Sequence, residues 1–204
     1  MNQSNVNQKK VNKSSRKPPE ILQRKIIAKS RLFEIEQLDL RFSNGVETQF
    51  ERLKSSPNGA VLVVPMLDED TVLLIREYAA GVDRYELALP KGRIEKGETP
   101  IEAANREMME EIGYSAKSLK QLTSLSLAPG YFEHQTHIVL AQNLFPQNAE
   151  GDEPEEIEVI PWKLSQLTSL LDEPECTEAR SIAALFLSRE FLSKQTLKSN
   201  KNSL

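Results

Sequence analysis

Six glutamates lie in one short run, residues 89–114, which reads LPKGRIEKGETPIEAANREMMEEIGY, and four of them are Glu98, Glu107, Glu110 and Glu111. On a helix Glu107, Glu110 and Glu111 would lie on one face, because they are separated by three and four positions. Like charges at these spacings destabilise a helix by roughly 0.2–0.5 kcal/mol per pair in water. A divalent cation reverses that sign, and oxygen ligands without histidine or cysteine suit Mg²⁺ or Mn²⁺. The pattern therefore indicates a metal site, and a solvated charged face is the alternative interpretation.

A helix over residues 100–112 must position these carboxylates. Thr99 is the predicted N-cap, Pro100 fits the first helical position, and Glu102 completes a capping box. Gly113 fits the left-handed residue that ends a helix. Apolar residues recur at helical spacing and predict a face packed on a sheet. They are Ile101, Ala104, Met108 and Ile112.

Strand patterns precede and follow this helix, and helical patterns end the chain. The strand pattern begins near Ile26, and the dipeptide Asn44-Gly45 predicts a hairpin turn. The expected strands are 31–42, 46–53, 59–67, 71–78, 84–89, 121–128, 136–144 and 156–162, and the expected final helices are 163–171 and 178–192. Strands, a helix, strands and then helices predict an α+β class, with a mixed sheet packed between helices.

Length and composition favour one soluble globular domain. The chain has 204 residues, of which 39% are hydrophobic and 27% charged. We expect this domain over residues 21–198, after a basic disordered tail of residues 1–20 and before a short tail of residues 199–204. No apolar run approaches the roughly 20 residues that cross a bilayer, so a membrane partner is not expected.

Charge and cysteine usage narrow the partners and the compartment. The net charge is −4, and the basic tail has no aromatic residues between its lysines, so nucleic acid is not an expected partner. Cys176 is the only cysteine and is expected to be a small buried residue. His134 and His137 are expected to be structural or exposed. Without a disulfide or a secretory signal, the cytoplasm is the expected compartment.

The glutamate run also has a recognisable form, G-x5-E-x7-R-E-U-x-E-E-x-G-U, in which U is bulky and apolar. Its positions are filled by Gly92, Glu98, Arg106, Glu107, Met108, Glu110, Glu111, Gly113 and Tyr114. This run resembles the signature of the Nudix superfamily, with Tyr114 as the loosest match. The resemblance implies the Nudix fold, a mixed sheet sandwiched between helices (α/β/α). It also implies hydrolysis of a nucleoside diphosphate linked to another group.

The same resemblance implies a set of metal ligands. Glu107 and Glu111 correspond to the principal ligands of Mg²⁺ or Mn²⁺, and Glu110 to a ligand of a second metal or of a bridging water. The backbone carbonyl of Lys91 corresponds to a further ligand. Carboxylates alone repel a pyrophosphate, so cations are needed to bridge enzyme and substrate.

Further residues correspond to supporting and catalytic roles. Arg106 is implied to hold the neighbouring carboxylates, and Glu98 to support the loop or an additional metal. The resemblance leaves two candidates for the catalytic base that deprotonates water. One is Glu153, on an acidic loop after the signature, and the other is Glu110 in the signature itself.

The flanking segments resemble the branch of the superfamily that acts on ADP-linked compounds. In that branch a proline shortly after the signature accompanies ADP-ribose as substrate, and a nearby tyrosine accompanies dinucleoside polyphosphates. Pro129 and Tyr131 fill these positions. The implied substrates are ADP-ribose, diadenosine triphosphate and NADH, and the implied assembly is a homodimer.

Each of the other candidate substrate residues has both a functional and a structural interpretation. Relatives carry an arginine directly after the aromatic residue that corresponds to Tyr78, but here Ala79 follows. Tyr78 and Tyr131 are candidates to stack on adenine, and Glu86 is a candidate to bind ribose; the alternatives are a core aromatic and a sheet-edge carboxylate. The arginines that remain for a phosphate contact are Arg52, Arg76 and Arg84.

Two other functions compete with this hypothesis. One is an RNA 5′-end pyrophosphohydrolase that uses the basic tail as an arm. The other is a non-catalytic Nudix module that senses ADP-ribose, although such modules usually lose signature carboxylates and this chain keeps them all. The isoprenoid isomerase branch is disfavoured, because it needs a catalytic cysteine and Cys176 lies elsewhere.

Overall fold

The computed structural model describes residues 16–55, 58–151 and 154–201, and the chain divides into two compact units, Met1–Leu53 and Lys54–Leu204. The single domain predicted over residues 21–198 spans both units. Residues 1–15 of the predicted disordered tail lie outside the described residues, and the first strand begins at Glu20.

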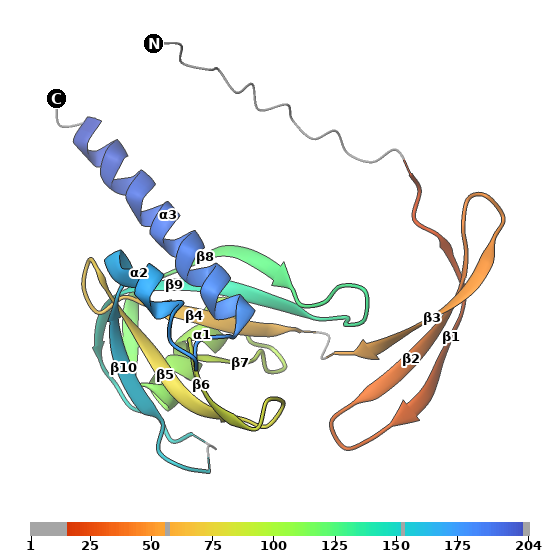
Figure 1. Ribbon diagram of the computed structural model, residues 1–204, viewed down its shortest axis with the longest axis horizontal. Coiled ribbons are helices and arrows are strands. Elements are labelled where there is room, and N and C mark those ends of the chain that lie inside the picture. Colours follow the sequence, from red (N-terminus) through yellow and green to blue (C-terminus); the bar gives the residue numbers. More distant parts are fainter. Residues whose placement is uncertain (1–15, 56–57, 152–153, 202–204) are drawn as a thin grey trace. The chain divides into compact units, whose positions relative to one another are not determined.

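The first unit contains a three-stranded sheet in the order β1-β2-β3, with β2 in the centre (Figure 1). Its strands are β1 (Glu20–Lys29), β2 (Glu34–Arg41) and β3 (Glu47–Lys54). The predicted hairpin is confirmed: Asn44 accepts a hydrogen bond from the Val46 amide, and Gly45 adopts a φ of 82°. The first part of β1 was not predicted, because all of its residues are exposed and no alternating pattern marks it.

The second unit contains two sheets rather than the single mixed sheet that the sequence predicted. The larger has the order β7-β4-β9-β8 and is mixed, because β4 and β9 are parallel and the other pairs antiparallel. The smaller has the order β10-β5-β6 and is antiparallel. The strands are β4 (Ala60–Pro65), β5 (Thr71–Ala79), β6 (Arg84–Ala88), β7 (Lys91–Arg93), β8 (Tyr114–Ser126), β9 (Gln135–Pro146) and β10 (Glu158–Lys163).

Three α-helices complete the described residues of the second unit (Figure 1). They are α1 (Pro100–Glu111), α2 (Leu167–Leu170), which follows a short 3-10 turn, and α3 (Ala179–Lys201). All three were predicted, but α2 is shorter than expected and α3 extends well beyond residue 192. In the part of the chain that the structure describes, no helix has the length and apolar character needed to span a membrane.

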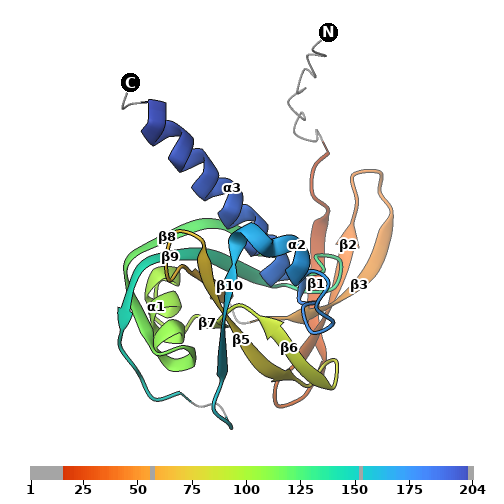
Figure 2. The same cartoon turned by 60° about the vertical axis from the view of Figure 1, so that its left-hand side comes forward.

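In the second unit, apolar clusters cover both faces of β4 and β5, with α1 in one cluster and α2 and α3 in the other, which confirms the predicted α/β/α sandwich (Figure 2). Side chains alternate along β4, because successive strand residues point to opposite faces. Val61 and Val63 pack in one cluster with Met108 of α1, whereas Leu62 and Val64 belong to the opposite cluster. The helix stripe predicted for α1 therefore faces the sheets as expected.

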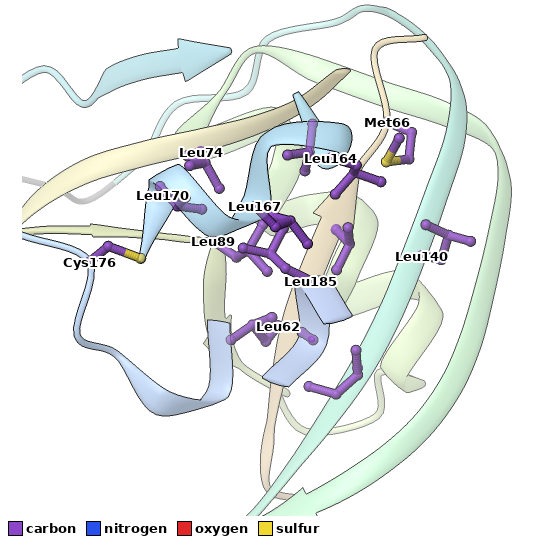
Figure 3. Packing of buried hydrophobic residues seen from close by; sticks show 14 of the residues in the cluster. Leu62, Met66, Leu74, Leu89, Leu140, Leu164, Leu167, Leu170, Cys176 and Leu185 are labelled. Atoms are coloured by element: carbon purple, nitrogen blue, oxygen red, sulfur yellow. The ribbon is translucent and has the colours of Figure 1, made fainter. Parts of the chain in front are cut away.

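The cluster on the opposite face of β4 combines strand residues with residues of α2 and α3 (Figure 3). Leu167 of α2 and Leu185 of α3 meet Leu62 and Leu89 there, all with exposed fractions below 2%. Cys176 lies at the margin of this cluster and is buried, which confirms its prediction. Both faces of the strands before the glutamate run are thus rigidly packed, so the run is held on a stable scaffold.

Candidate active site

Helix α1 begins with the predicted cap. The Thr99 side chain accepts a hydrogen bond from the Glu102 amide, and the Glu102 carboxylate accepts one from the Thr99 amide at 2.8 Å. Gly113 follows the helix with a φ of 72°, a conformation that costs a residue with a Cβ about 1–2 kcal/mol. Both ends of the helix are therefore defined by local sequence, which sets the rotation of its charged face.

Arg106 lies at the centre of the carboxylates. Its guanidinium donates to Glu98 at 2.8 Å, to Glu107 at 2.8 Å and to Glu110 at 2.9 Å. It also donates to the backbone carbonyl of Arg93 at 2.9 Å. The hydrogen bonds from Arg106 hold the pKa of Glu98 below its ordinary value. One guanidinium balances only one of three negative charges, so the cluster keeps a net demand for positive charge.

Among the signature carboxylates, Glu111 has the greatest need for a compensating positive charge. Glu111 is 6% exposed, and its carboxylate accepts a hydrogen bond from the Lys91 amide at 3.0 Å. Burial raises the pKa of Glu111 to about 8, although the Lys91 ammonium acts in the opposite direction. Burial also raises the pKa of Glu107, against the effect of Arg106. Desolvation on this scale disfavours ionised carboxylates unless a cation compensates it.

Gly92 allows the backbone of β7 to reach this face of α1. A Cβ at Gly92 would lie 1.9 Å from Oε1 of Glu107, which is a severe overlap. Residue 92 must therefore be glycine for the Glu107 carboxylate to lie against the strand. The contact brings the Lys91 carbonyl group and the α1 carboxylates into the same region of the molecule.

A cleft of about 710 Å³ opens beside these groups. Its walls include Gly92, Glu107 and Glu110 from the signature, together with Glu150 and Gly151 from the loop after β9. A second cleft of about 610 Å³ shares Glu110 and Gly151 with the first. The acidic loop thus borders the signature, as expected, but the predicted base Glu153 lies outside the described residues.

The residues present fit a hard divalent cation. The Glu107 carboxylate lies against Gly92, Glu107 and Glu111 are buried, and the charge of the signature carboxylates exceeds that of Arg106. In residues 16–55, 58–151 and 154–201, no three acidic, histidine or cysteine side chains already converge at metal-ligand spacing. Glu107 and Glu110 are turned to Arg106, and Glu111 to the Lys91 amide, so these side chains would bind a cation by exchanging hydrogen bonds.

Four predicted substrate residues lie on the smaller sheet, in β5 and β6, namely Arg76, Tyr78, Glu86 and Arg84, which is the partner of Glu86. Arg76 forms ion pairs with Glu158 and Glu175. Tyr78 is 47% exposed, so it is not the core aromatic of the alternative interpretation, and its hydroxyl donates to Asp83 at 2.6 Å.

Glu86 is the third of these residues. It is 6% exposed and accepts hydrogen bonds from Arg84 at 2.6 Å and from the amide and hydroxyl of Thr177. Burial acts to raise the pKa of Glu86, but the hydrogen bonds from Arg84 and Thr177 outweigh it, so the pKa is lowered.

The remaining predicted substrate residues lie in other parts of the chain. Pro129 and Tyr131 are on the loop between β8 and β9, where Tyr131 is 72% exposed. Arg52 belongs to the first unit and donates two hydrogen bonds to the buried Glu36, at 2.7 and 2.9 Å. The structure thus brings together the signature residues, whereas the substrate candidates are spread over β3, β5, β6 and one loop.

Glu77 lies beside the signature and was not among the predicted residues. Glu77 forms an ion pair with the Lys91 ammonium group at 2.5 Å. A signal for it exists, because strand alternation places Glu77 on the same face of β5 as Leu73 and Ile75, which pack toward α1. This ion pair adds a further carboxylate close to the β7 backbone.

Comparisons with known proteins identify the family of this chain. Residues 57–186 match the model of the NUDIX domain, and residues 19–52 match that of the NudE-type Nudix hydrolase N-terminal domain. The chain is 48% identical to an ADP compounds hydrolase of Escherichia coli K12, over 91% of this chain and 98% of the relative. It is 32% identical to an ADP-ribose pyrophosphatase of Bacillus subtilis 168, over 80% of this chain and 91% of the relative.

A solved structure is similar as well. A crystal structure of an ADP compounds hydrolase superposes with a TM-score of 0.83 at 47% identity, and covers 89% of this chain and 98% of the other. The family models together match most of the chain, from the first strand to α3. With its complete signature from Gly92 to Tyr114, the chain belongs to the Nudix hydrolases, in the branch defined by the NudE-type N-terminal domain.

Proposed function

We propose that this enzyme hydrolyses the pyrophosphate bond of ADP-linked compounds and releases AMP together with a second phosphorylated product. ADP-ribose, diadenosine triphosphate and NADH are the proposed substrates. The single observation that carries the proposal is the signature face of α1, where buried carboxylates exceed the charge of Arg106 beside a cleft. The names of the two relatives, an ADP compounds hydrolase and an ADP-ribose pyrophosphatase, support the substrate class.

The reaction needs a divalent cation, and we propose Mg²⁺, with Mn²⁺ as a substitute. Glu107, Glu111 and the carbonyl of Lys91 are the proposed ligands, with Glu110 on a second ion or a bridging water. When bound, the cation neutralises charge on the diphosphate and lowers the pKa of the attacking water. Hard oxygen donors without histidine or cysteine support this choice of ion.

The side chains around the cleft orient the reacting groups. Arg106 holds Glu98, Glu107 and Glu110 in one array, so that they do not swing into solvent. Glu98 also accepts a hydrogen bond from the Glu95 amide at 2.9 Å, which ties the loop before α1 to the array. Glu110, which lines both clefts, and Glu153 remain the two candidates for the base that takes the proton of the water.

The substrate residues are proposed on exposure and charge. Tyr78 and Tyr131 offer exposed rings for adenine, and Pro129 shapes the loop that carries Tyr131. Arg76 and Arg52 are the proposed phosphate contacts, each of which would exchange an existing ion pair. Glu86, oriented by Thr177 and Arg84, is the proposed ribose contact.

We further propose that the protein is a cytoplasmic homodimer. The N-terminal sheet supports this assembly, since a unit of this size rarely stabilises itself without a partner. Large apolar side chains are exposed on it, namely Ile21, Leu22, Ile26, Ile27, Phe33, Phe42, Val46 and Phe50. Light scattering should give twice the chain mass of 23.1 kDa, and the Phe50→Asp variant should shift toward the monomer. A monomeric wild-type protein would refute the dimer.

A substrate panel tests the proposed activity. ADP-ribose, diadenosine triphosphate, NADH and 5′-triphosphorylated RNA are incubated with Mg²⁺ or Mn²⁺, and AMP or pyrophosphate is measured. We expect AMP from the ADP-linked compounds, with similar rates after residues 1–15 are deleted. Turnover of the RNA alone, lost on that deletion, would favour the RNA-end alternative. Binding of ADP-ribose without turnover would favour the sensing module.

A further inference from the structure

The segment that enters β7 is anchored from α3 as well as from α1. The Leu89 amide donates to the Ser181 hydroxyl at 3.0 Å, across 92 positions of sequence. Leu89 is 0% exposed and Ser181 is 1% exposed, so water does not compete for this contact. A buried amide needs an acceptor, and β6 ends one residue earlier, at Ala88. Ser181 therefore supplies the acceptor that the strand ladder no longer provides.

The Ser181 hydroxyl is itself oriented by Glu178. It donates to the Glu178 carboxylate at 2.7 Å, and the Ser181 amide donates to the same oxygen at 2.7 Å. Arg180 donates to the other oxygen at 2.7 Å. A hydroxyl has one proton and two lone pairs, so donation to Glu178 leaves a lone pair for the Leu89 amide. The direction of the contact is thus determined by the first turn of α3.

The opposite end of the segment is the proposed metal site. Pro90 has no amide hydrogen, and its carbonyl accepts from the Val63 amide at 2.8 Å. The Lys91 amide donates to Glu111 at 3.0 Å, and the Lys91 carbonyl is the proposed metal ligand. Three consecutive residues are therefore each fixed by one backbone hydrogen bond, first to α3, then to β4 and then to α1.

From this geometry we propose that Ser181 is a positioning residue for the divalent-cation site. Its hydroxyl fixes Leu89, and through the rigid Pro90 it sets the orientation of the Lys91 carbonyl and of the amide that holds Glu111. The inference rests on the proposed function, because it takes the Lys91 carbonyl and Glu111 as ligands. Mutation of a residue that orients the ligands of a metal typically lowers metal affinity or activity by about 10–100-fold.

The test is a titration of the full chain with Mn²⁺, without substrate, in which free Mn²⁺ is measured by electron paramagnetic resonance. Ser181→Ala should weaken Mn²⁺ binding by about 10-fold. Ser181→Thr, which keeps the hydroxyl, should retain affinity close to that of the wild type. Hydrogen exchange of the Leu89 amide should accelerate in Ser181→Ala and not in Ser181→Thr.

The matched control is Ser188→Ala. Ser188 lies on the same helix and is 0% exposed, but within the described part of the chain its hydroxyl has no hydrogen-bond partner. This control should leave Mn²⁺ affinity unchanged. Equal weakening in Ser188→Ala and Ser181→Ala would overturn the proposal, because the effect would then reflect general loosening of α3.

Two further outcomes separate this proposal from the proposed function. If Glu111→Gln weakens Mn²⁺ binding and Ser181→Ala does not, the positioning role is wrong and the metal site stands. If wild-type protein binds no Mn²⁺, both are wrong. Should Ser181→Ala fail to fold, the Glu178→Ala variant is tested in its place. This variant removes the carboxylate that orients the Ser181 hydroxyl, and Glu178 is less buried than Ser181. The Mn²⁺ affinity of this variant should fall about 3-fold, and wild-type affinity would overturn the proposal.

Discussion

Glu86 on β6 and Glu111 on α1 are both 6% exposed, but Glu111 lies deeper in the protein, and the pKa values of the two carboxyl groups shift in opposite directions. Three groups donate hydrogen bonds to Glu86, namely the Arg84 guanidinium and the amide and hydroxyl of Thr177, and these bonds lower its pKa despite its burial. Among the described residues one backbone amide donates to Glu111, and burial raises its pKa to about 8.

The difference separates a carboxylate that stabilises the fold from one that we propose to bind a metal. A buried carboxylate whose lone pairs are satisfied stabilises the fold as it stands. A buried carboxylate with too few donors is maintained at a cost in stability, which is expected where function requires the charge. Glu86 belongs to the first class in the protein without substrate, where its donors would also hold it in place for the proposed ribose contact, and Glu111 belongs to the second class.

The largest predicted effect is that of Glu111→Gln on turnover. Removing the charge should lower kcat/KM for ADP-ribose by more than about 100-fold, beyond the effect typical of residues outside the first coordination shell. The fold should stay intact, as measured by circular dichroism and cooperative thermal unfolding. Activity close to that of the wild type would refute the metal role of Glu111.

Gly92→Ala should come next, with an activity loss of about 10–100-fold. The added methyl group would overlap the Glu107 carboxylate, at 1.9 Å, and would displace it from β7. Gly81→Ala is the control, since a Cβ there meets no atom within 4 Å. The steady-state rate at saturating Mg²⁺ measures both variants, and equal rates would show that the close approach of Gly92 and Glu107 does not matter.

The pH dependence of stability should separate the two glutamates in metal-free protein. The folded pKa of Glu111, about 8, lies above the ordinary value of 4.5, so its protonated form favours folding. Its contribution is therefore lost progressively as pH rises from about 4.5 to about 8. Urea unfolding of Glu111→Gln at pH 8 in EDTA should give a stability about 2 kcal/mol above that of the wild type. A destabilised variant would contradict this assignment.

Glu86→Gln should change stability in the opposite direction and by less. The lowered pKa of Glu86 means that its stabilisation is present at neutral pH and is lost on acidification through the folded pKa. Losing the charged hydrogen bonds to Arg84 and Thr177 should cost about 1 kcal/mol at pH 7. Urea unfolding at pH 7 and pH 4 measures this, and a stabilised variant would remove the contrast with Glu111.

Local sequence was sufficient to predict much of the site and of the fold. The caps of α1 and its apolar stripe involve residues within a few positions of one another, and they were predicted correctly. The hairpin was predicted because Asn44-Gly45 favours one turn geometry. Strand β7 was missed, since it has three residues and depends on pairing with β4.

Long-range contacts were beyond prediction from the pattern. The bond between Leu89 and Ser181 joins positions 92 apart, and no periodicity records it. The split of the strands into two sheets likewise depends on which edges pair in space. Burial of Glu111 beside the Lys91 amide also needed the fold, because the sequence places both only as members of one signature.

The most direct test of the central claim is the effect of Mg²⁺ on thermal unfolding of the wild type, Glu111→Gln and Glu86→Gln. A ligand that binds only the folded state raises the unfolding temperature. We predict that Mg²⁺ raises it in the wild type and in Glu86→Gln, and leaves it nearly unchanged in Glu111→Gln. An equal rise in all three proteins, or none in the wild type, would contradict the assignment of the cation site to α1.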